Sequence, residues 1–161
     1  METHVFLWTA LLAALPISEL RGAIPFAIYQ GVPWYFAYIF AAFINALVAP
    51  VCWIFLSTLH KLFLKMNWYK QFFNRFVERA RLKLHEKVEK WGWLGITIFV
   101  AIPLPATGAW TGTLGAWILG LSKRRTIPAV ILGVLISGAV VTTVVILGVN
   151  ALGFLVKQIS S

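Results

Sequence analysis

The sequence predicts an all-α integral membrane protein, an inverted repeat of a re-entrant helical hairpin followed by a transmembrane helix. Three observations predict it: an apolar excess, hydrophobic stretches of two distinct lengths, and a lopsided distribution of basic residues. Of 161 residues, 60% are hydrophobic and only 12% are charged. Soluble domains average about 25% charged residues, and a chain this short cannot bury so much apolar surface in one core.

Two hydrophobic runs, 33–60 and 127–156, exceed the about 20 apolar residues that a crossing helix needs. Each begins beside a proline, Pro33 or Pro128, which suits the first turn of a helix because its missing N–H needs no partner there. Small residues recur at four-residue spacing in both runs: Ala37, Ala41, Asn45 and Ala49, then Ala129, Gly133 and Ser137. Close helix packing is the default interpretation of these stripes. A substrate path is the alternative, and Asn45, the amide in mid-crossing, favours it.

The remaining hydrophobic stretches are too short to cross. Residues 5–17 would form about 20 Å of helix, and residues 93–102 and 109–121 are separated by the sequence PLPATG. Two short helices around a Pro/Gly break indicate a hairpin that enters and leaves the membrane on one side. Charge favours this hairpin over a single crossing. If residues 93–121 form this hairpin, both basic segments, 61–90 and 123–125, face the cytoplasm. These two segments hold twelve of the 14 basic residues, as the excess of basic residues on the inner side requires.

The same topology places the first hairpin on the opposite side of the membrane. Residues 1–161 then form one membrane domain with two repeats, 1–60 and 92–161, of opposite orientation. In the segment between them, 61–91, apolar residues at three- or four-residue spacing predict an amphipathic helix on the inner membrane surface. A docking surface for a partner is the alternative for this linker. Paired interrupted segments are the best sequence indication of a transporter's substrate site.

The first interruption is the sequence PISELRGAIP, in which two charges lie between Pro16 and Pro25. A charge inside a membrane costs about 2.5–3.5 kcal/mol, so an ionisable residue there is a functional hypothesis by default. We expect desolvation to raise the pKa of Glu19, which would then carry protons near neutral pH. Arg21 offers a planar fork for phosphate or carboxylate, and Gly22 lets a ligand approach the backbone. We expect Pro16 and Pro25 to end the two short helices. The alternative is that the two charges pair locally and only hold the loop.

The second interruption carries no charge. Its hydroxyls and glycines, with Asn45 and the residues of the first interruption, complete the predicted substrate site: Pro103, Pro105, Thr107, Gly108, Thr111 and Gly112. The N-terminus of a short helix here would attract an anion. A tight hairpin that needs glycine for its geometry alone is the alternative.

Several other classes of function find no support in the residues. The three histidines, His4, His60 and His85, lack metal-ligand spacing, no G-x-S-x-G motif is present, and aspartate is absent. We therefore expect no enzyme, metal or cofactor. The formal net charge of +9 is explained by membrane topology, and no nucleic-acid motif accompanies it. The first residues carry no basic charge, unlike a signal peptide, so we expect the N-terminus to be retained.

The motifs ELRGAIP and PLPATGAWTGTLGAW and the basic linker resemble the putative small multidrug export family of prokaryotic membrane proteins. That family is in turn similar to the DedA/VTT superfamily. The resemblance covers nearly the whole chain. It implies two opposed re-entrant loops, the prokaryotic cell membrane, and proton-linked lipid-carrier work such as translocation of undecaprenyl phosphate. Glu19 would match the acidic residue of the first loop. DedA proteins carry arginines in the second loop, which this chain lacks, so phosphate binding would rest on Arg21.

The sequence thus predicts a proton-coupled secondary transporter or flippase that moves a polyprenyl phosphate or an amphiphilic drug. The alternative is a membrane assembly or interaction protein that transports nothing. Because the chain has about half the usual size of a transporter, we also expect a homodimer.

Overall fold

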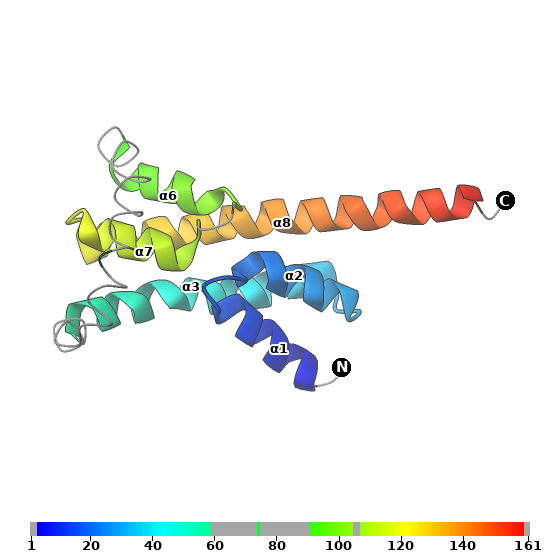
Figure 1. The fold of residues 1–161 in the computed structure, drawn as a ribbon, viewed down its shortest axis with the longest axis horizontal. Helices are drawn as coiled ribbons and strands as arrows, with labels where there is room; N and C mark the ends of the chain where they lie inside the picture. Colours follow the sequence, from blue (N-terminus) through cyan, green and yellow to red (C-terminus); the bar gives the residue numbers. More distant parts are fainter. Residues whose placement is uncertain (1–2, 59–73, 75–90, 105–106, 160–161) are drawn as a thin grey trace.

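The computed structural model describes residues 3–58, 74, 91–104 and 107–159, with side chains described up to residue 149. The secondary structure of this described part consists of helices, and no strand is present in it. The order is α1 (Thr3–Ala14), α2 (Glu19–Tyr29), α3 (Trp34–Thr58), α6 (Trp93–Ala101), α7 (Ala109–Ile118) and α8 (Lys123–Ile159) (Figure 1). The predicted amphipathic helix over 61–91 falls almost wholly outside the described residues and stays a prediction.

The two predicted crossings are confirmed as long apolar helices. An 18-residue stretch of α3 has a mean hydropathy of 2.3, and one within the described part of α8, Lys123–Val149, has 2.7. Both helices are long enough to cross a membrane. They lie side by side and run in opposite directions (Figure 1). The end of α3 and the start of α8 therefore lie toward the same end of the molecule (Figure 1).

Each long helix is preceded by a pair of short helices. α1 and α2 have 12 and 11 residues, and α6 and α7 have 9 and 10. At about 1.5 Å per residue, none of them is long enough to cross a membrane. Each pair folds back on itself, and the turns of the two pairs face each other near the middle of the molecule (Figure 1). Residues 93–121 therefore form two short helices separated by a turn rather than one continuous helix.

The predicted roles of two prolines are wrong. Pro25 does not end a helix but lies inside α2, which continues to Tyr29. Pro128 lies inside α8, because that helix already begins at Lys123. A proline costs a helix one N–H donor, but packing against neighbouring helices can offset that loss within a membrane protein. Pro33 does directly precede α3, and its carbonyl accepts the N–H of Ala37 at 2.9 Å.

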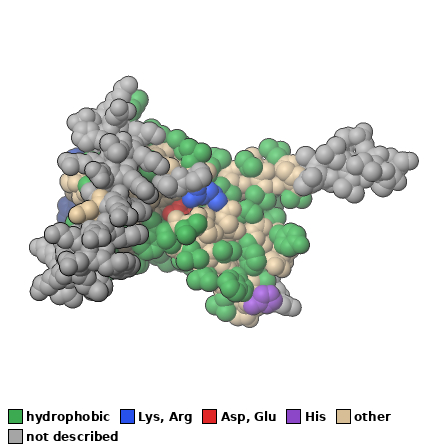
Figure 2. Space-filling view, viewed as in Figure 1, with side chains coloured by type: hydrophobic (Ala, Val, Ile, Leu, Met, Phe, Trp, Pro, Cys, Tyr) green, Lys and Arg blue, Asp and Glu red, His purple; other side chains and the backbone are tan. Residues whose placement is uncertain are grey.

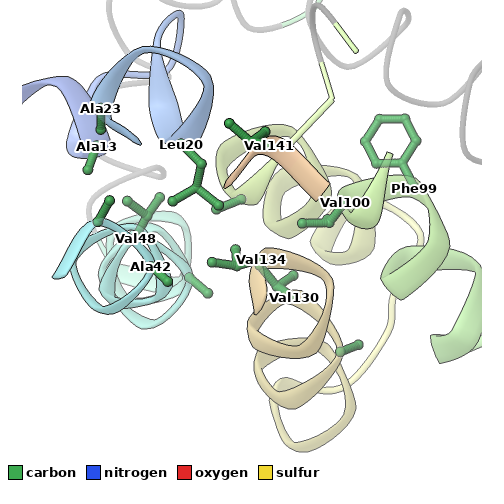
Figure 3. Packing of buried hydrophobic residues seen from close by; sticks show 14 of the residues in the cluster. Ala13, Leu20, Ala23, Ala42, Val48, Phe99, Val100, Val130, Val134 and Val141 are labelled. Atoms are coloured by element: carbon green, nitrogen blue, oxygen red, sulfur yellow. The ribbon is translucent and has the colours of Figure 1, made fainter. Parts of the chain in front are cut away.

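The core joins the two halves. Figure 3 shows Ala13, Leu20 and Ala42 of the first half and Val100, Val130 and Val134 of the second converging in one packed region. The predicted small-residue stripes are buried, as close packing between helices requires. At Gly133 a Cβ would lie 2.6 Å from the Cβ of Val100, so α6 packs directly on the backbone of α8. The Thr97 hydroxyl also donates to the carbonyl of Ala129 at 3.1 Å.

Candidate functional site

The C-terminus of α1 is held by side chains from two other helices. The amide Nδ2 of Asn45 donates to the carbonyl of Ala13 at 2.7 Å, and the indole Nε1 of Trp110 donates to the carbonyl of Ala14 at 2.9 Å. The last carbonyls of a helix have no partner within it, so these two bonds satisfy groups that would otherwise be exposed or unpaired. Because Trp110 belongs to α7, the bond also fixes the first hairpin turn against the second.

Glu19 begins α2 directly after that turn, rather than lying within the turn as the sequence suggested. Its φ is +47°, an uncommon value for a residue with a side chain, which persists only where the surroundings impose it. Glu19 is only 5% exposed, which is unusual for a side chain that can carry a charge. Its Oε1 accepts the backbone N–H of Trp110 at 3.5 Å. The carboxylate therefore lies at the N-terminus of α7, where free N–H groups and the helix dipole favour negative charge.

Gly108 makes this approach of the carboxylate possible. It precedes α7 with a φ of +143°, a conformation that side chains rarely adopt. A Cβ at this position would overlap the carboxylate of Glu19. The positive φ fits the alternative interpretation, in which glycine serves the backbone geometry of the hairpin. The missing side chain also makes the space that Glu19 occupies.

Arg21 also reaches the second hairpin. Its Nη2 donates to the backbone carbonyl of Thr107 at 3.3 Å. The two charged side chains of α2 thus both bond to the second hairpin, and within the described residues no ion pair links them to each other. Figure 2 shows acidic and basic side-chain atoms next to each other near the middle of this face, flanked by hydrophobic side chains.

The electrostatics of Glu19 follow from its position. Glu19 is almost fully buried, and the loss of hydration disfavours its ionised carboxylate. The backbone N–H of Trp110 and the charge of Arg21 act in the opposite direction, because each favours the ionised form. Burial and these neighbouring groups therefore have opposing effects on the charge of Glu19.

The structure brings four of the predicted site residues together at the two turns: Glu19, Arg21, Thr107 and Gly108. The hydroxyl of Thr107 serves its own turn, within reach of the carbonyls of Ile102 and Leu104 at 2.6 and 2.7 Å. The hydroxyl of Thr111 donates to the carbonyl of Gly108 at 3.4 Å in the first turn of α7. Pro103 lies in the turn after α6, and Pro105 lies outside the described residues.

Three other predicted site residues, Gly22, Gly112 and Asn45, lie against neighbouring groups of the protein. A Cβ at Gly22 would overlap the side chain of Ser18, and one at Gly112 would overlap Val100 of α6. Asn45 is buried and bonded to α1, as described above. Trp110 is the site residue that sequence reasoning missed. A tryptophan two residues after a glycine that ends a turn could have indicated it, because such a residue supplies a free N–H in the first turn of the next helix.

Replacing Asn45 with alanine should therefore destabilise the fold. The substitution leaves the Ala13 carbonyl unpaired in the interior, at an expected cost of about 1–3 kcal/mol in the free energy of unfolding. Unfolding in detergent measures this cost. Thr143→Ala is the matched control, because it removes an exposed hydroxyl that bonds only within α8, to the carbonyl of Ala139. A variant at Asn45 with unchanged stability but impaired transport would instead put this residue on a substrate path.

Comparison with known proteins matches most of the chain to a described family. A model of the family described as "putative small multi-drug export protein" matches residues 19–140. The match runs from Glu19 into α8 and includes α2, α3, both short helices of the second half and the turn between them. No curated protein and no solved structure matches the chain.

Proposed function

Because the chain belongs to the putative small multi-drug export protein family, we propose that it is a proton-coupled secondary transporter of the prokaryotic cell membrane. Family membership and two long apolar helices together identify a membrane protein. The family description supports a general role in export. Proton coupling, the substrate and the sidedness of the chain are our proposals.

The proposed architecture is an inverted repeat. Each half has the same order of elements, two short helices and then a long one. In our proposal the two hairpins are re-entrant from opposite sides, so that their facing turns meet near mid-depth of the membrane. Transporters of this type bind substrate where interrupted helices meet. Such a site is formed by the ends of α1, α2, α6 and α7 that meet at the two hairpin turns.

One observation carries the proposed mechanism: the carboxylate of Glu19 occupies the N-terminus of a helix that belongs to the other hairpin. A protonated Glu19 loses the negative charge that favours this position. The N–H groups at the start of α7 and the guanidinium of Arg21 then become available to an anionic group of the substrate. Return of the carboxylate, with release of its proton, displaces the substrate. Proton and substrate thus exchange at one place, which couples their movements.

The substrate class follows from the same groups. The site offers N–H groups and a guanidinium to an anion, within a largely apolar surrounding. We therefore propose an amphiphile with a phosphate or carboxylate group, and a polyprenyl phosphate fits this description. A cationic amphiphilic drug would instead bind the ionised carboxylate. We propose no enzymatic activity and no cofactor. A homodimer is proposed only by analogy with half-size transporters.

The test is uptake into proteoliposomes that contain the purified protein and a pH gradient across the bilayer. A fluorescent polyprenyl phosphate analogue and a fluorescent cationic amphiphile are supplied in separate experiments. We expect movement of the phosphate analogue that stops when a protonophore collapses the gradient. Protein-free liposomes are the control. Absence of protein-dependent movement of either compound would favour the alternative, an assembly or interaction protein that transports nothing.

Cysteine labelling tests the proposed topology separately. Cys52 is the single cysteine of the chain and is buried, so Cys52→Ala provides a background without thiols. Single cysteines placed in 70–90 and in 123–125 should react with a membrane-impermeant maleimide from the same side. A cysteine at Gln30 should react from the other side. Labelling of the two basic segments from opposite sides would show that residues 93–121 cross the membrane.

A further inference from the structure

A second site lies away from the hairpin turns, where α6 and α8 begin. Here a hollow of about 460 Å³ is lined by Trp93 of α6 and by Arg124, Arg125 and Pro128 of α8. The residues that line this hollow are different from those that contact Glu19. We propose that this hollow binds the phosphate group of an anionic membrane lipid.

The charges of the hollow suit a phosphate. Both arginines are exposed, and a guanidinium matches a phosphate through two parallel N–H bonds. They follow Lys123 in the first turn of α8, which contains no acidic residue. Three cations at the positive end of a helix dipole raise the local potential. The one acidic side chain in the described part of the chain, Glu19, bonds to α7 instead. A bound anion would relieve this concentration of positive charge.

The uncharged walls favour a lipid over a soluble phosphate. Trp93 is 43% exposed, and an indole with an apolar body and a polar N–H is typical of the boundary between membrane and water. On α8, Leu132 and Ile136 follow Pro128 at four-residue spacing, which places the three side chains on one face of the helix. These two side chains are 43% and 42% exposed. An apolar ridge therefore leads away from the hollow, and an acyl chain can lie along it while the phosphate contacts the arginines.

General attraction of basic residues to an anionic surface is the competing explanation, and the chain offers a matched control for it. Lys123 stands in the same helical turn and is exposed like the arginines, but it does not line the hollow. Removing any one of the three charges lowers the net charge equally. Only removal of an arginine alters the hollow. The proposal therefore requires that Arg124→Gln and Arg125→Gln behave differently from Lys123→Gln.

The experiment measures the thermal stability of the purified full-length protein in a neutral detergent. Phosphatidylglycerol, phosphatidylcholine or inorganic phosphate is added over a range of concentrations. For the unchanged protein we expect saturable stabilisation by phosphatidylglycerol. The half-saturating concentration should rise about tenfold in each arginine variant, since a hydrogen bond to a charged group contributes about that factor or more. It should stay within about twofold in Lys123→Gln, because a single exposed charge contributes little.

Each outcome has a definite meaning. Three outcomes overturn the site: equal weakening in all three variants, no saturable stabilisation by phosphatidylglycerol or inorganic phosphate, or equal stabilisation by phosphatidylcholine and phosphatidylglycerol. Inorganic phosphate that stabilises with the same dependence on the arginines supports the phosphate chemistry and identifies a soluble source. If an arginine-to-glutamine variant does not fold, Arg124→Lys replaces it, because it keeps the charge and loses the planar fork. Unchanged binding of phosphatidylglycerol by that variant would also overturn the proposal.

Discussion

Replacing Glu19 with glutamine is expected to abolish proton-driven uptake while the protein stays folded. The amide has nearly the shape of the carboxylic acid, and its oxygen can still accept the N–H of Trp110. It cannot release a proton, so the exchange between carboxylate and substrate at the start of α7 stops. Uptake into proteoliposomes under a pH gradient measures the loss. Size-exclusion and thermal profiles confirm that the variant is intact.

Two results would count against this role of Glu19. Full proton-driven uptake by Glu19→Gln would show that the proton is carried elsewhere. A variant that unfolds, rather than one that is folded and inactive, would point to a structural role for the carboxylate. Glu19→Ala separates these cases further, because it removes both the proton and the acceptor for Trp110. It should be less stable than Glu19→Gln.

Replacing Gly108 with alanine is expected to displace the Glu19 carboxylate from α7 and thereby stop uptake. The new Cβ would overlap the carboxylate, which must then give up the N–H of Trp110. The backbone would also be strained at a φ of +143°. Together these effects should lower the free energy of unfolding by about 2–4 kcal/mol, which is more than either strain or overpacking alone typically costs. Chemical unfolding in detergent and uptake measure the two consequences.

Gly120→Ala is the matched control for Gly108→Ala. Gly120 also has a positive φ, +74°, but nothing lies within 4 Å of the position its Cβ would take. This variant should therefore incur only backbone strain, about 1 kcal/mol, and keep its uptake. Equal activity of the two glycine variants would show that the contact between Glu19 and α7 is dispensable.

The sequence by itself determined the features that depend on local composition. The lengths of two apolar runs predicted α3 and α8, and the PLPATG break predicted that residues 93–121 form two short helices. Small residues at four-residue spacing marked the buried faces of the long helices, because that periodicity follows directly from the geometry of a helix. The charges in ELRGAIP lie at the end of the first hairpin that contacts the second.

The tertiary structure decided which groups meet. Pro25 and Pro128 lie inside helices, because packing between helices outweighs the local preference of proline. Trp110 bonds to Glu19 across 91 positions of the chain. Asn45 caps α1 instead of standing free in mid-crossing. A periodicity of three or four residues has no bearing on pairs so distant. Their contact exists only because α2, α3, α7 and α8 pack around one core, which brings the two hairpin turns together.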